Sequence, residues 1–74
     1  MIKTPDIYLS AYLKVKEYRL KAVEKDGRKA IFVFAGEQEQ LDKEVEQYEN
    51  GQGMVAALVY ADEVKRLKKI AINI

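Results

Sequence analysis

The chain has 74 residues, of which 49% are hydrophobic and 34% charged, so it is expected to form one small folded domain over residues 1–74. Its 13 basic and 12 acidic side chains give a net charge of +1. With no His and no Cys, it cannot build a Ser-His-Asp triad, a Cys-His pair, a zinc site, a disulfide framework or an iron–sulfur cluster.

The N-terminal third begins with a helix-start signal. Thr4 is the expected N-cap, Pro5 occupies the first helical position and Asp6 lies near the positive end of the helix dipole. Apolar residues recur from there at spacings of three and four, which predicts a helix up to about Tyr18 with a wide apolar face.

A β-hairpin is expected next. Two runs, 19–25 and 28–34, flank Asp26-Gly27, and Asp-Gly is a strong signal for a two-residue type I′ turn. That turn would set Glu24 opposite Lys29. Both faces of the ribbon are at least half apolar, so helices are expected to cover one face, and a helix, a third strand or a second subunit the other.

Two helices complete the expected order α-β-β-α-α, an α+β domain. Segment 37–50 carries a narrow apolar stripe on an acidic helix that ends at Asn50-Gly51, and the last helix begins near Met54. Its apolar face includes Tyr60 and Leu67, and Asp62 is placed for an ion pair with Arg66. The tail 70–74 fits either continued helix, favoured through about Ile70, or a third strand.

Charge is distributed in blocks, because residues 1–29 hold eight bases and four acids, residues 30–60 six acids and one base, and residues 61–74 four bases and two acids. A nucleic-acid contact, if there is one, is expected at four bases of the last helix: Lys65, Arg66, Lys68 and Lys69. Lys14, Lys16, Arg19 and Lys21 are candidates to extend that patch. The near-neutral net charge argues against this partner.

Other site chemistries have weaker signals. Asp42, Glu46 and Glu49 have helical spacings that would bring carboxylates together around Mg²⁺ or Ca²⁺, but solvated acidic residues account for the same pattern. We therefore expect no catalytic residues, metal or cofactor. The five tyrosines are interpreted as residues at the rim of the core, although tyrosines can also stack on bases or anchor a protein interface.

Three segments carry a family resemblance: residues 7–13, reading IYLSAYL, residues 31–34, reading IFVF, and residues 60–68, reading YADEVKRLK. With these segments, the chain resembles a set of small uncharacterised domains encoded by bacteria, phages and prophages. The resemblance covers nearly the whole chain and carries no catalytic signature. It implies an accessory role of unknown kind.

The leading hypothesis is thus a non-enzymatic interaction module that binds a protein partner or a second copy of itself, through the less-covered hairpin face or the apolar tail. The alternative is a small nucleic-acid-binding accessory protein. A cytoplasmic location without membrane contact is expected, because the longest apolar run, Met54 to Ala61, is far shorter than the ~20 residues of a membrane helix, and residues 1–3 lack an apolar signal core.

Overall fold

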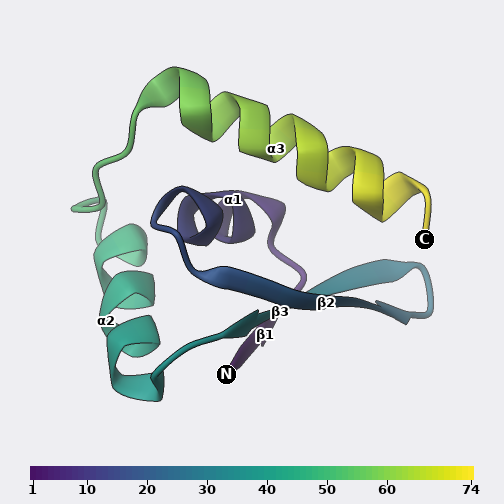
Figure 1. Cartoon of the computed structure of the whole chain (residues 1–74), viewed down its shortest axis with the longest axis horizontal. Helices are drawn as coiled ribbons and strands as arrows, with labels where there is room; N and C mark the ends of the chain where they lie inside the picture. Colours follow the sequence, from purple (N-terminus) through teal and green to yellow (C-terminus); the bar gives the residue numbers. More distant parts are fainter.

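A computed structural model describes residues 1–74, and the fold is α+β as the sequence predicts. Three helices pack with one antiparallel sheet, in the order β-α-β-β-α-α (Figure 1). The elements are β1 (Ile2–Thr4), α1 (Ile7–Val15), β2 (Arg19–Asp26), β3 (Lys29–Ala35), α2 (Gln38–Glu49) and α3 (Ala57–Ile72).

The sheet has a third strand that the sequence analysis misses. Its strand order is β1-β3-β2, and β1 pairs antiparallel with β3 through Ile2 opposite Phe34 and Thr4 opposite Phe32. The third strand therefore comes from the N-terminus. The tail contributes none, because α3 continues to Ile72.

The start of α1 lies two residues later than predicted. Asp6 is the N-cap, and its Oδ1 accepts hydrogen bonds from the backbone N–H of Tyr8 at 2.9 Å and of Leu9 at 3.1 Å. Thr4 belongs to β1, and its hydroxyl accepts from the Asp6 N–H at 3.1 Å. The expected cap at Thr4 was wrong because its hydroxyl stabilises the turn between strand and helix instead.

The hairpin is present, but its register differs from the expected one. Asp26 pairs with Lys29 and Glu24 with Ile31, so the loop consists of Gly27 and Arg28. Gly27 has a φ of +61° whereas Arg28 has a negative φ, which is the pattern of a type II′ turn with glycine first. The expected type I′ turn at Asp26-Gly27 was therefore wrong by one residue.

A β-bulge at Lys21 changes which residues share a face of β2. Val23 pairs with Phe32, and beyond the bulge Leu20 pairs with Phe34 while Arg19 pairs with Ala35. Leu20 thus joins Val23, Phe32 and Phe34 on the apolar inner face of the sheet.

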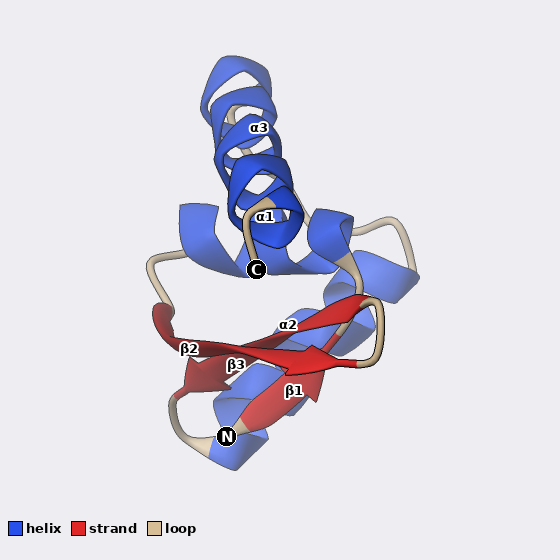
Figure 2. Cartoon of the chain, turned by 90° about the vertical axis from the view of Figure 1, so that its right-hand side faces the viewer, coloured by secondary structure: helices blue, strands red, loops and turns tan.

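The molecule has three layers, namely the sheet, α1 and α3, and both helices lie on the inner side of the sheet (Figure 2). Helix α1 lies directly over the sheet, α3 lies over α1, and α2 stands beside them at the end of the sheet (Figure 1). The core lies between these layers, and its fully or almost fully buried members are Leu9, Ala11, Tyr12, Leu13, Phe32, Phe34, Leu41 and Leu67.

The outer face of the sheet is covered by no helix. Its central residue Val33 is nevertheless only 3% exposed. Lys3 and Glu24, on the strands either side of β3, form an ion pair of 3.3 Å between Nζ and Oε1. Their aliphatic stems thus shield part of this apolar surface, which is how long charged side chains cover nonpolar neighbours.

Candidate functional site

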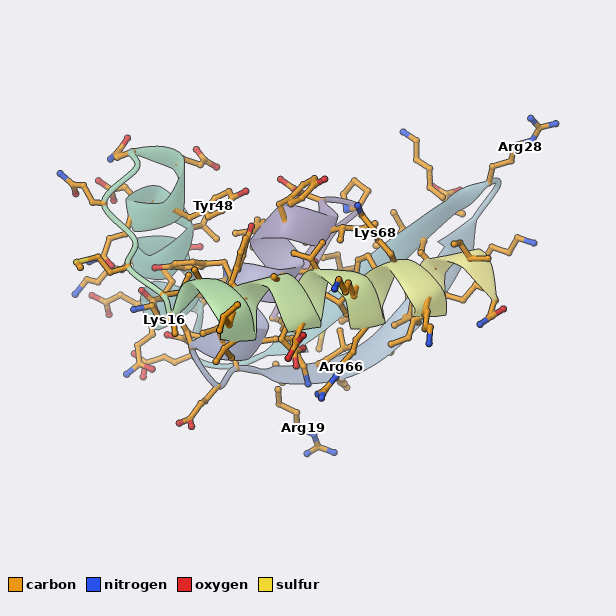
Figure 3. All side chains as sticks on the ribbon, turned by 90° about the horizontal axis from the view of Figure 1, so that it is seen from above. Lys16, Arg19, Arg28, Tyr48, Arg66 and Lys68 are labelled. Atoms are coloured by element: carbon orange, nitrogen blue, oxygen red, sulfur yellow. The ribbon has the colours of Figure 1, made fainter.

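The four bases singled out in the sequence lie on α3 and are all exposed, but they do not form one patch. Arg66 and Lys68 are about 160° apart around the helix axis, and Figure 3 shows them leaving opposite sides of α3. Lys65 and Lys69 lie between them, one turn apart, on the side that faces away from the core. Only Lys65 and Lys69 therefore share one side of the helix.

Two of the four bases already have partners within the chain. Arg66 Nη1 donates to Glu63 Oε1 at 3.2 Å, so the expected ion pair with Asp62 was wrong. Glu63 is the better partner because its side chain is only 13% exposed. The Lys68 Nζ lies 5.6 Å from the centre of the Tyr8 ring, a cation–π distance. Lys65 and Lys69 remain free for an external anion.

Large apolar side chains are exposed on either side of this basic pair. Leu58 is 83% exposed and Ile72 82% exposed. Leu58, Lys65 and Ile72 are spaced seven residues apart, so they line one face of the helix over about 21 Å. We call Leu58, Lys65, Lys69 and Ile72 the outward face of α3. Met54, just before the helix, is as exposed as Leu58.

Sequence reasoning missed Leu58 and Ile72 as surface residues. The signal that identifies them is the seven-residue repeat, which places both opposite Leu67, the one buried residue of α3. A helix whose second apolar stripe faces solvent has more nonpolar surface than its own fold needs.

Tyrosines gather where α1, α2 and α3 meet. The rings of Tyr12 and Tyr48 are 5.3 Å apart between centroids, and the Tyr60 hydroxyl donates to the Tyr8 carbonyl at 3.1 Å. The Tyr12 hydroxyl donates to Glu44 Oε1 at 3.4 Å. Tyr12 is buried, Tyr48 and Tyr60 are half-buried and Tyr8 is exposed. Tyr48 and Tyr60 thus lie at the rim of the core as expected, whereas Tyr12 belongs to the core itself.

The environment keeps these hydroxyls protonated. Burial, followed by the negative charge of Asp6, raises the pKa of Tyr48 to about 12. Burial is also the main cause that raises the pKa of Tyr12, Tyr18 and Tyr60. At neutral pH the Tyr12 hydroxyl therefore donates from α1 to α2, and the Tyr60 hydroxyl from α3 to α1.

Both aliphatic hydroxyls of the chain are engaged in the same local structure. Ser10 is fully buried, and its Oγ donates to the Asp6 carbonyl at 2.7 Å. Thr4 is 8% exposed and holds the turn before α1. These hydroxyls stabilise the entry to α1.

The acidic helix α2 presents its carboxylates singly. Asp42 accepts a hydrogen bond from Gln38 Nε2 at 2.9 Å, and Glu46 and Glu49 are exposed. No group of three or more carboxylates in the chain is placed to hold a metal ion. The spacing of Asp42, Glu46 and Glu49 therefore brings no metal-binding set together.

An open cavity of about 320 Å³ lies between the hairpin turn, the start of α1 and the end of α3. It is lined by Pro5, Ile7, Arg28, Lys29, Ala30, Phe32 and Ala71. The lining combines an apolar floor with two cations and no acid, so chemically it suits a small apolar group that carries a negative charge.

The three helices of the structure are each too short or too polar to cross a bilayer. Comparison with curated proteins finds no match, and comparison with solved structures finds none either. A family model, described as a domain of unknown function (DUF5659), matches residues 1–73. The resemblance to a family of uncharacterised domains is thereby confirmed, and the chain belongs to the DUF5659 family.

Proposed function

We propose that this protein is a non-catalytic interaction module that binds a partner protein through the outward face of α3. The observation that carries the proposal is the exposure of Leu58 and Ile72 on one face of a helix, at 83% and 82%. Nothing in the fold uses these side chains. Large apolar residues on a shared exposed stripe are typical of surfaces that are covered by another protein.

The charges of this face define the partner. Lys65 and Lys69 lie between the two apolar ends and form no ion pair, although one exposed acid, Asp62, lies on the same side of the helix one turn from Lys65. A second α3 packed antiparallel on this face, with Leu58 against Ile72, would place Lys65 against Lys65, which is unfavourable. We therefore expect an amphipathic helix of another protein as the partner. It should have acidic residues at its centre and one apolar residue at each end, and these two apolar residues should be about two seven-residue repeats apart.

A library of helical peptides, selected against the full chain, tests this surface. The expected consensus has one acidic centre between two apolar anchors, and its affinity should fall at least tenfold for Lys65→Glu combined with Lys69→Glu, because each attraction becomes a repulsion. The Leu58→Asp substitution should lower the affinity of the chain for the same peptides. Lys43→Glu on α2, an exposed lysine outside the face, is the matched control and should leave binding unchanged.

The result that would overturn the proposal is a set of selected peptides that bind the Lys65→Glu, Lys69→Glu variant as tightly as the unmodified chain. A selection that yields no peptide dependent on Leu58 would do the same. Circular dichroism of each variant establishes that a lost affinity does not come from unfolding.

Nucleic-acid binding is the second candidate, favoured by the two free lysines one turn apart on α3. The measurement is fluorescence anisotropy of labelled single- and double-stranded oligonucleotides at two salt concentrations. Affinity that falls steeply with salt, and that is lost when Lys65, Arg66, Lys68 and Lys69 are all replaced by Gln, would favour nucleic acid. The engagement of Arg66 with Glu63 and of Lys68 with Tyr8 supports the protein partner instead.

The biological setting is also part of the proposal. The resemblance described above suggests an accessory protein encoded by a bacterium, a phage or a prophage, and a chain without cysteines is suited to a reducing cytoplasm. Fractionation of cells that express the tagged protein, followed by detection of the tag, tests the location.

A further inference from the structure

Strand β2 leaves one edge of the sheet unpaired. It forms hydrogen bonds with β3 on one side only, because the strand order is β1-β3-β2. All eight of its residues are exposed except Leu20 and Val23, which are half-buried. An edge strand of this length presents a row of N–H and C=O groups to any strand that can align with it.

We propose that β2 pairs antiparallel with β2 of a second copy, about a two-fold axis at Val23, so that two sheets join into one of six strands. A two-fold axis perpendicular to the sheet keeps the inner and outer faces of the two copies aligned. Residues that lie opposite each other must therefore share a face.

The bulge at Lys21 brings opposite charges into register. With Val23 opposite itself, Ala22 lies opposite Glu24 of the second copy. Beyond the unpaired Lys21, Leu20 lies opposite Lys25 and Arg19 opposite Asp26. Arg19 and Asp26 share the outer face, because their partners in β3 are Ala35 and Lys29. The symmetric pair thus contains two contacts between Arg19 and Asp26 and none between like charges.

A register centred on Ala22 would also set opposite charges against each other, Arg19 against Glu24, but Glu24 is already bound to Lys3 whereas Asp26 is free. A pairing centred on Glu24 would place the two Glu24 carboxylates against each other, and like charges directly opposite destabilise a ladder. The free charges of Arg19 and Asp26 therefore favour the register centred on Val23.

The side chain of Arg19 is available for such a contact. It extends away from the body of the molecule beside β2 (Figure 3) and forms no ion pair within the chain. Asp26 also forms no ion pair, although Lys29 lies opposite it in β3. Glu24 is already bound to Lys3, and in the proposed register it faces only Ala22.

The dimer would present two copies of the α3 surface in the same direction. Helices α1 and α3 lie over one face of the sheet, and the two-fold axis leaves that face common to both copies (Figure 2).

The inference is independent of the proposed function, because the β2 edge and the outward face of α3 do not overlap. If both hold, a partner with two acidic helices would bind with avidity.

Sedimentation velocity of the full chain, up to millimolar concentration, tests the pairing with two charge reversals. Arg19→Asp and Asp26→Arg should each raise the dimer dissociation constant about tenfold or more, because two attractions become two repulsions. Mixed one to one, the two variants should form a heterodimer, since each then supplies the charge that the other needs. Lys43→Asp and Glu46→Arg on α2 are matched controls and should dimerise like the unmodified chain.

Hydrogen exchange on the unmodified chain provides a second measurement that needs no variant. Amides of β2 that point away from β3 should exchange more slowly as protein concentration rises, while those of α3 should not change. A chain that stays monomeric at millimolar concentration would overturn the inference. So would a dimer that survives both charge reversals, or one that is lost on Leu58→Asp, since it would then be held by α3.

Discussion

Helices α1 and α3 lie side by side, yet the fold uses them in opposite ways. Five consecutive residues of α1, from Leu9 to Leu13, are buried. Among the 16 residues of α3 only Leu67 is buried. The difference arises because α1 is enclosed by the sheet and α3, whereas α3 is the outermost layer (Figure 1). Apolar residues of α1 are thus explained by folding, and those on the outward face of α3 are not.

The largest test of this contrast compares two leucines. Leu13→Ala, at a fully buried position, should lower the free energy of unfolding by about 2–5 kcal/mol. Leu58→Ala should change it by less than about 0.5 kcal/mol, because the side chain is exposed. Urea unfolding followed by circular dichroism measures both values. An equal loss in the two variants would show that Leu58 belongs to the core.

A second test concerns the segment that leads from α2 into α3. A Cβ added at Gly53 would lie 2.5 Å from a ring carbon of Tyr12, so Gly53→Ala should cost about 1–3 kcal/mol. Gly51→Ala is the matched comparison. Its Cβ would have open space, and the cost of about 1 kcal/mol comes from the φ of +71°. Thermal unfolding of both variants should show the larger loss at Gly53.

Helix capping sharpens the comparison further. Asp6→Ala removes the side-chain cap of α1 and should cost about 1 kcal/mol. Ala56 is the N-cap of α3 and offers no side-chain hydrogen bond, so Ala56→Ser should add about 0.5–1 kcal/mol. Urea unfolding would reveal a gain at one helix and a loss at the other. A loss at Ala56 would indicate that the start of α3 needs its present residue.

The smallest expected effect is the pH dependence of the tyrosine cluster. Because the pKa of Tyr48 rises from 10.0 to about 12 on folding, the neutral hydroxyl is favoured in the folded state. Its contribution to stability is complete below about pH 10 and is lost as the pH rises towards 12. Unfolding free energies measured from pH 9 to 11 should fall, and Tyr48→Phe should reduce that fall. An unchanged slope would contradict the assignment.

Local patterns were sufficient to predict the helices, the hairpin and the α+β class. Strand β1 could not be predicted, because three residues show no period and their pairing with β3 depends on a contact across the whole of α1 and β2. The register was missed for a related reason. The sequence Asp-Gly is compatible with two kinds of turn, and the bulge at Lys21 that rotates Leu20 inward is set by packing against Phe34.

The candidate site was predicted in part. The four bases of α3 were identified, because charge is visible in the sequence. Their separation around α3 and the spacing of Arg66 from Glu63 follow from helical geometry, but the contact of Lys68 with Tyr8 depends on how α3 packs on α1. The apolar ends of the outward face were overlooked because a helix rich in apolar residues does not reveal which of its stripes is buried.

The short strand β1 has a consequence for the order in which the chain assembles. The hairpin closes through a two-residue loop, whereas Ile2 meets Phe34 across some thirty intervening residues, a slower closure. We therefore expect β1 to dock late, after the hairpin and α1. Until it does, β3 has a bare edge beside two phenylalanines, so we expect the docking of β1 to remove a surface prone to aggregation.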